Sequence, residues 1–154
     1  MKTQNTWDKF YLGVAASAAQ MSYAEDRKVG AIIVKDGNII SFSYNGTPPG
    51  NDNSTEKNGV TLSSVLHAEA QAIAKVAQST TSSKGATLYC TLSPCVECAK
   101  LIIGAGIRRV VFDQLYKDTS GINLLDKNGV LTNDSDENHN RLIPIDQLRH
   151  TGLL

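Results

Sequence analysis

This 154-residue sequence lacks disulfide-forming cysteine pairs, a net charge and long apolar runs. Its three cysteines (Cys90, Cys95 and Cys98) are too few and too clustered for a disulfide framework. Fifteen basic and fifteen acidic residues give a net charge of zero, which argues against a general nucleic-acid binder, because such a protein needs a strongly basic face. No apolar run reaches the roughly 18 residues of a membrane span, and the start of the chain lacks the apolar stretch of a secretion signal. We therefore expect a cytoplasmic protein that binds neither membranes nor nucleic acids.

Regular patterns of apolar residues predict a single domain, residues 1–154, built from alternating helices and strands. A hydrophobic fraction of 41% is ordinary for a globular chain that buries a core. The first predicted helix has apolar residues at helical spacing: Trp7, Phe10, Tyr11, Val14, Ala15, Ala18 and Met21. The other predicted elements are strands at 29–35, 39–44, 86–91, 109–113 and 141–145, and helices at 65–78 (capped by Ser63 or Ser64), 94–103 and 122–127.

The order of these elements predicts an α/β fold. A turn at 36–38 joins the first two strands into an antiparallel hairpin, whereas later strands are separated by helices. We therefore expect a three-layer α/β/α sandwich around a central mixed five-stranded sheet. Residues 45–64 form a long loop of turn-forming residues, and loops of this length are often functional. Residues 132–140 are polar and are predicted to be a solvated loop.

Two cysteines three residues apart at a predicted helix start indicate a metal site. Cys95 and Cys98 follow Pro94 and lie on one face of that helix, whose positive end favours thiolates. With His67, at the start of the preceding helix, they supply three ligands for Zn²⁺. A structural zinc site normally has four protein ligands, but Cys90 lies on a predicted strand, and the other histidines lie far along the chain. Three ligands leave one position for a water molecule, which is typical of catalytic zinc.

Glu69 lies two residues after His67, where a carboxylate can flank that water. It can accept the water's proton and pass it to a leaving amine. The combination H-x-E followed by P-C-x-x-C is the signature of zinc nucleobase deaminases. A redox role for the C-x-x-C pair is the alternative, but the sequence offers no thioredoxin-like context, and a proline precedes the pair.

Four segments carry a resemblance to a known family. The segments are Lys28-Val-Gly-Ala-Ile-Ile-Val-Lys35, Ser43-Tyr-Asn-Gly-Thr-Pro48, Leu66-His-Ala-Glu-Ala-Gln-Ala-Ile73 and Ser93-Pro-Cys-Val-Glu-Cys-Ala-Lys-Leu-Ile-Ile103 with Ala105-Gly-Ile-Arg-Arg-Val-Val111. Together they resemble the deoxycytidylate (dCMP) deaminases of the cytidine deaminase superfamily, from Lys28 to about Asp126. The resemblance implies a cytidine deaminase-like fold and hydrolytic deamination of dCMP to dUMP, which supplies thymidylate synthesis.

The resemblance also implies residue roles. His67, Cys95 and Cys98 would hold one Zn²⁺, and Glu69 would move protons among the attacking water, ring atom N3 and the departing amine. The backbone amide of Ala68 would donate to pyrimidine O2, and Asn45 would contact the deoxyribose hydroxyl. The 5′-phosphate needs cationic or hydroxyl partners, and the candidates are Arg27, Tyr116 and Lys117.

Regulation by nucleotides is a further implication of the resemblance. Members of this family are commonly hexameric, activated by dCTP and inhibited by dTTP, and the triphosphate carries Mg²⁺. The regulatory site would use Tyr44, Asn45 and Gly46 near a subunit interface, and Ser43 stands here where the family has glycine.

Two other hypotheses about the function remain open at this point. An RNA adenosine deaminase or a free-nucleoside deaminase would keep the zinc chemistry and change the substrate, although a neutral chain disfavours a polyanionic one. A zinc-stabilised binding domain without turnover would have no need of a carboxylate at Glu69.

Overall fold

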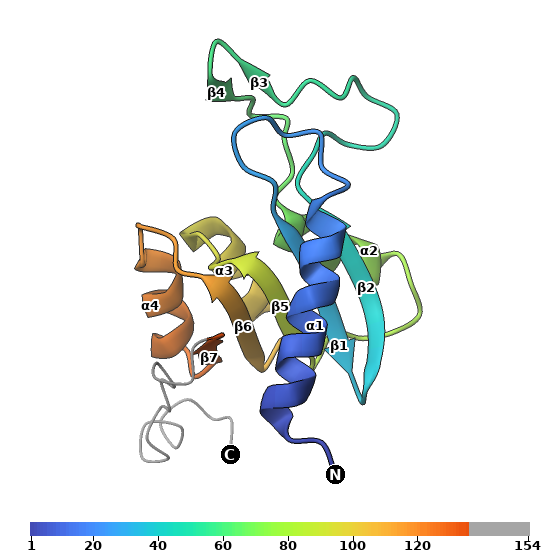
Figure 1. Ribbon diagram of the computed structural model, residues 1–154, viewed down its shortest axis with the longest axis vertical. Coiled ribbons are helices and arrows are strands. Elements are labelled where there is room, and N and C mark those ends of the chain that lie inside the picture. Colours follow the sequence, from blue (N-terminus) through green and yellow to red (C-terminus); the bar gives the residue numbers. More distant parts are fainter. Residues whose placement is uncertain (136–154) are drawn as a thin grey trace.

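The computed structural model describes residues 1–135, which form a central sheet with helices on both faces (Figure 1). The strands of the sheet are β1 (Gly30–Lys35), β2 (Asn38–Tyr44), β5 (Thr87–Leu92), β6 (Arg109–Gln114) and β7 (Leu131–Asp134). The helices within this range are α1 (Gln4–Ala19), α2 (Ala68–Ala77), α3 (Val96–Gly104) and α4 (Ser120–Lys127). A separate hairpin, β3 (Glu56–Lys57) with β4 (Val60–Thr61), projects from the long loop beyond one end of the sheet (Figure 1).

The sheet is mixed and has the strand order β2-β1-β5-β6-β7, which confirms the predicted fold class. Strand β1 is antiparallel to both β2 and β5, whereas β5, β6 and β7 are parallel. The strand predicted at 141–145 lies outside the described residues. The prediction of a solvated loop from 132 onward is wrong at its start, because β7 pairs with β6 there. Thr132 is buried, and its hydroxyl donates to a carboxylate oxygen of Asp126 at 2.6 Å, so a polar sequence still makes a strand.

Helix α1 covers one face of the sheet, and α2, α3 and α4 cover the other (Figure 1). The α1 side buries Tyr11, Leu12, Ala15, Ile32, Val34, Tyr89 and Val111. The larger core on the opposite face includes Ala72, Val76, Leu88, Ile102, Val110, Ile122 and Leu125. Helix α1 lies so close to β1 that a Cβ at Gly30 would meet the Ala15 carbonyl oxygen at 2.0 Å. These two cores lie between the sheet and the helical layers on either side of it.

The buried face of α1 differs from the predicted one. Tyr11, Ala15 and Ala18 are buried as expected, but Trp7 and Phe10 keep 43% and 54% of their surface exposed. Met21, which lies beyond the end of the helix, is also exposed. The helix turns a polar residue, Asp8, inward instead, because that carboxylate has hydrogen-bonding partners beneath it on the sheet.

Helices α2 and α3 both begin at the end of the sheet that faces the β3–β4 hairpin (Figure 1). Their N-cap residues are His67 and Cys95, both with extended backbone angles. The predicted starts at 65 and 94, with a serine cap at 63 or 64, are therefore a few residues too early. As a result, His67 and Cys95, which the sequence analysis singled out, lie at the N-termini of these two helices.

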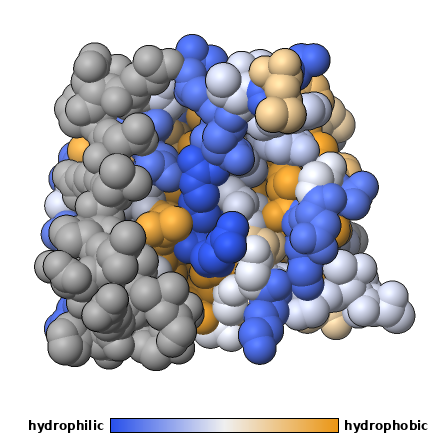
Figure 2. Space-filling model, turned by 90° about the horizontal axis from the view of Figure 1, so that it is seen from below, coloured by the Kyte–Doolittle hydropathy of each residue, from blue (hydrophilic) through white to orange (hydrophobic). Residues whose placement is uncertain are grey.

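Seen from below, the part of the surface that is not grey carries hydrophilic residues with hydrophobic areas among them (Figure 2). None of the helices within residues 1–135 has the length and apolar character that crossing a membrane requires.

Candidate functional site

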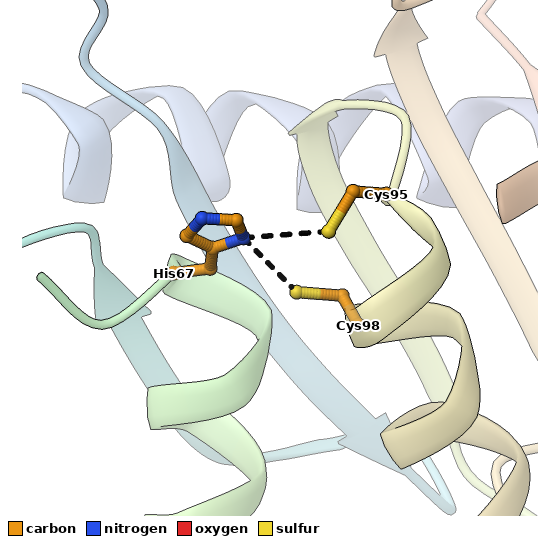
Figure 3. Close-up of side chains that lie close together, drawn as sticks. All are labelled: His67, Cys95 and Cys98. Atoms are coloured by element: carbon orange, nitrogen blue, oxygen red, sulfur yellow. Dashed lines mark hydrogen bonds between the residues drawn. The ribbon is translucent and has the colours of Figure 1, made fainter. Parts of the chain in front are cut away.

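The side chains of His67, Cys95 and Cys98 converge between the starts of α2 and α3 (Figure 3). The imidazole Nδ1 lies 3.5 Å from the Cys95 sulfur and 3.4 Å from the Cys98 sulfur. All three candidate ligand atoms lie within 4.8 Å of one another. Given zinc–sulfur and zinc–nitrogen bond lengths, ligand atoms around one tetrahedral ion lie about 3.5–3.8 Å apart. The group therefore fits Zn²⁺ with little rearrangement.

Local backbone geometry explains why these three atoms meet. Cys95 is the N-cap of α3 and Cys98 lies in its first turn, so the two sulfurs share one side of the helix. His67 precedes α2 in an extended conformation, and its ring therefore projects beyond the helix end toward α3. Because the starts of α2 and α3 lie side by side, both cysteine sulfurs lie close to the imidazole of His67.

Electrostatics in this cluster favour a thiolate at Cys95. Hydrogen bonds from the Cys98 thiol and from His67 lower the pKa of Cys95 to about 3. The same hydrogen bond to Cys95, together with burial and the nearby Glu69 charge, raises the pKa of Cys98. Hydrogen bonding to Cys95 also raises the pKa of His67, although burial opposes this. Thiolates are the form in which cysteine binds metals.

Glu69 lies beside the cluster, in the first turn of α2. Only 4% of its surface is exposed, and its Oε2 accepts a hydrogen bond from the Cys98 thiol at 3.6 Å. Burial raises the pKa of this carboxyl group. A separation of two residues would point Glu69 away from His67 in a regular helix, but the extended backbone at His67 brings the carboxylate next to the cluster. The carboxylate of Glu69 therefore lies next to the three candidate ligands.

A cavity of about 600 Å³ opens above this group. It is lined by nearly all of the residues that the sequence singled out for catalysis, metal or substrate: Arg27, Asn45, His67, Ala68, Glu69, Cys95, Tyr116 and Lys117. Cys98 is buried below it. Residues from five separate stretches of the chain thus surround one space.

The side-chain amide of Asn45 makes hydrogen bonds to backbone groups of the segment that leads into β1. Its Oδ1 accepts from the Val29 amide at 2.8 Å, and its Nδ2 donates to the Arg27 carbonyl oxygen at 2.8 Å. The three residues predicted for the regulatory site do not all line the same cavity. Tyr44 and Gly46 line a second cavity of about 310 Å³, whereas Asn45 lines the first.

The sequence interpretation missed several polar residues of the larger cavity, among them Ser93 and Glu56. Ser93 is buried, and its hydroxyl oxygen accepts from the Tyr116 amide at 2.7 Å, so it fastens the segment that carries Tyr116 and Lys117. Its position directly before Pro94-Cys95 was the available signal. Glu56, on β3, had no signal beyond its place in a long loop.

A mixed sheet with a His/Cys/Cys group and an adjacent buried carboxylate defines the class of zinc-binding nucleobase deaminases. Residues 5–114 match the family described as the cytidine and deoxycytidylate deaminase zinc-binding region. The match covers well over half of the chain, and the chain belongs to this family.

Individual relatives point to the same family. The deoxycytidylate deaminase of Mycobacterium phage D29 is 38% identical over 121 residues, which cover 69% of this chain and 93% of the phage protein. The human deoxycytidylate deaminase is 38% identical over 115 residues, and the match spans 64% of its length. The crystal structure of dCMP deaminase from cyanophage S-TIM5, in complex with dCMP and dUMP, superposes with a TM-score of 0.83 and 38% identity. That match covers 86% of this chain and 99% of the cyanophage chain.

Proposed function

We propose that this protein catalyses the hydrolytic deamination of dCMP to dUMP and thereby supplies dUMP for thymidylate synthesis. The observation that carries the proposal is the convergence of His67, Cys95 and Cys98 beside the buried Glu69, at the base of one cavity. The phage and human relatives are named deoxycytidylate deaminases, and the cyanophage structure holds dCMP and dUMP, which supports this choice of substrate. The overall reaction is dCMP plus water to dUMP plus ammonia.

His67, Cys95 and Cys98 would hold one Zn²⁺ per chain. When bound, the ion supplies Lewis acidity that activates water as a nucleophile near neutral pH. The ligand chemistry fits, because two sulfurs and one imidazole nitrogen already lie at distances suited to a single ion.

Glu69 is the proposed proton carrier. It accepts one proton from the attacking water and gives it to ring atom N3. It then takes the remaining proton of the hydroxyl group added at C4 and delivers it to the amine as the bond between C4 and N4 breaks. Burial raises the pKa of its carboxyl group and thereby helps Glu69 to hold a proton between these steps. The amide of Ala68 is available for pyrimidine O2, because the first N–H groups of a helix have no partner within it.

The rim of the cavity provides groups for the sugar and the phosphate. Asn45 uses one N–H of its side-chain amide on Arg27, and we assign the other to the deoxyribose hydroxyl. Arg27 and Lys117 supply positive charge, and Tyr116 a hydroxyl, for the 5′-phosphate.

We further propose activation by dCTP and inhibition by dTTP, each with Mg²⁺, in a cytoplasmic hexamer. The second cavity supports this assignment, because Tyr44, Gly46 and Lys75 line it and Lys75 offers a charge for phosphate. Ser43 donates a hydrogen bond to the side-chain oxygen of Gln71, which also lines this cavity, so the hydroxyl in place of the family's glycine is directed toward α2.

Ammonia release from dCMP, deoxycytidine, CMP and dCTP tests the function, with and without a zinc chelator and with added dCTP or dTTP. We expect turnover of dCMP, its loss after chelation, and a change in rate with each triphosphate. Preference for deoxycytidine would refute the phosphate assignment and retain the zinc chemistry. If none of the four compounds is deaminated, an RNA substrate, or binding without turnover, replaces this proposal.

A further inference from the structure

The β3–β4 hairpin is joined to the loop before β1 by a single carboxylate. Oε1 of Glu56 accepts from the Glu25 amide at 3.2 Å and from the Asp26 amide at 3.5 Å. Its Oε2 lies 3.4 Å from the same Glu25 amide and also accepts from the hydroxyl of Thr55. Two successive backbone N–H groups thus point at one anion, an arrangement in which backbone dipoles stabilise negative charge.

These contacts lower the pKa of the Glu56 carboxyl group. The Thr55 hydroxyl lowers the pKa of Glu56, and the two backbone amides add to this effect against slight burial. Because amide and hydroxyl donors compensate its charge, the carboxylate contributes less repulsion toward an anionic ligand in the same cavity than a free carboxylate would.

The loop that Glu56 holds leads directly to Arg27. Asp26, Arg27 and Glu56 all line the larger cavity. On the far side of Arg27, Asn45 holds the Arg27 carbonyl oxygen and the Val29 amide. The segment that carries the Arg27 guanidinium is therefore fastened at both ends, once from the hairpin and once from the end of β2.

We propose that Glu56 is a positioning residue for the 5′-phosphate end of the nucleotide. By holding residues 25 and 26, it sets the backbone from which Arg27 reaches the phosphate. This inference rests on the proposed function, since it presupposes a substrate with a phosphate. Loss of the Glu56 carboxylate should weaken the binding of dCMP while leaving the chemistry at the metal unchanged.

The test compares the zinc-loaded wild type with Glu56→Ala, Glu56→Gln and, as a matched control, Lys57→Ala on the same hairpin. We expect Glu56→Ala to raise KM for dCMP on the order of tenfold, the effect of one lost charge-assisted hydrogen bond, with kcat within about twofold. The value of kcat/KM for deoxycytidine, which has no phosphate, should be the same in Glu56→Ala as in the wild type. Glu56→Gln keeps an acceptor oxygen and should lie between wild type and Glu56→Ala, whereas Lys57→Ala should match the wild type.

Hydrogen exchange at the Glu25 and Asp26 amides provides a readout that does not depend on activity. Exchange there should be faster in Glu56→Ala than in the wild type. An unchanged KM for dCMP, a lower KM in both Glu56 variants, or an equal loss with deoxycytidine would overturn the inference and leave the proposed function standing. A wild type that does not deaminate dCMP would overturn both.

Discussion

The guanidinium of Arg109 on β6 holds the carboxylate of Asp8 on α1 through two parallel hydrogen bonds, at 2.6 and 2.9 Å. The side chains are only 15% and 13% exposed, and the Tyr89 hydroxyl donates to the same carboxylate at 2.7 Å. This pair fastens the α1 layer to the centre of the sheet, and it explains why α1 turns a polar residue inward.

Breaking the pair from one side should destabilise the fold. Asp8→Ala leaves the Arg109 charge buried without its partner, and Arg109→Ala does the same to Asp8, so each should lower the free energy of unfolding by about 3 kcal/mol. Urea denaturation measures this, with Lys9→Ala on the exposed side of α1 as the control. The double variant should lose clearly less than the sum of the two single losses. Strictly additive losses would show that the two side chains do not interact energetically.

The same pair should shape the stability at acid pH. Burial raises the pKa of Asp8, but hydrogen bonds from Arg109, Tyr89 and Gln4 outweigh it and leave the pKa below the ordinary value of 3.8. Because the folded-state pKa is the lower one, the stabilisation by Asp8 is complete above pH 3.8 and is lost as the pH falls through the folded-state pKa. The stability difference between wild type and Asp8→Asn should therefore narrow below pH 3.8. Parallel unfolding free energies across the acid range would contradict this explanation.

Glu69→Gln should separate catalysis from metal binding. The amide keeps the shape of the side chain but cannot carry the proton, so we expect dCMP turnover to fall by about 100-fold or more. Zinc content should stay at the wild-type value, because Glu69 is outside the group of ligand atoms. Steady-state rates and metal analysis of the same preparation measure both quantities. Glu97→Gln, which removes an exposed carboxylate from α3, is the control and should keep wild-type turnover. Full turnover in Glu69→Gln would show that another group carries the proton.

Gly121 is required where α4 meets the start of α3. A Cβ at this position would lie 2.0 Å from the Pro94 carbonyl oxygen and 2.7 Å from the carbonyl carbon of Cys95. Gly121→Ala should therefore cost about 1–3 kcal/mol of stability and weaken zinc binding, because the backbone of a ligand must shift.

Gly13→Ala is the matched substitution, since nothing lies within 4 Å of its added Cβ. On an exposed helix position it should stabilise the protein by up to about 1 kcal/mol. Thermal denaturation and zinc titration of the two variants make the comparison. Equal behaviour of the two variants would contradict the close approach at Gly121.

The sequence by itself determined the parts of this protein that depend on short spacings. Cys95 and Cys98, three residues apart at a helix start, must share a face of that helix, and the alternation of helices and strands is enough to predict a mixed sheet between helical layers. The candidate metal ligands and the fold class could therefore be predicted from the sequence.

Only the tertiary structure decided which distant residues meet. Asp8 and Arg109 are 101 positions apart, and Glu56 and Glu25 are 31 apart. The apolar spacing in α1 favoured Trp7 and Phe10 as buried residues, yet the helix turns Asp8 toward Arg109 on the sheet and leaves these two side chains partly exposed. Strand β7 forms in a polar segment because β6 offers it a parallel edge. Local spacing sets the geometry within one helix or strand, whereas sheet register and loop packing are set by partners that lie far away in the chain.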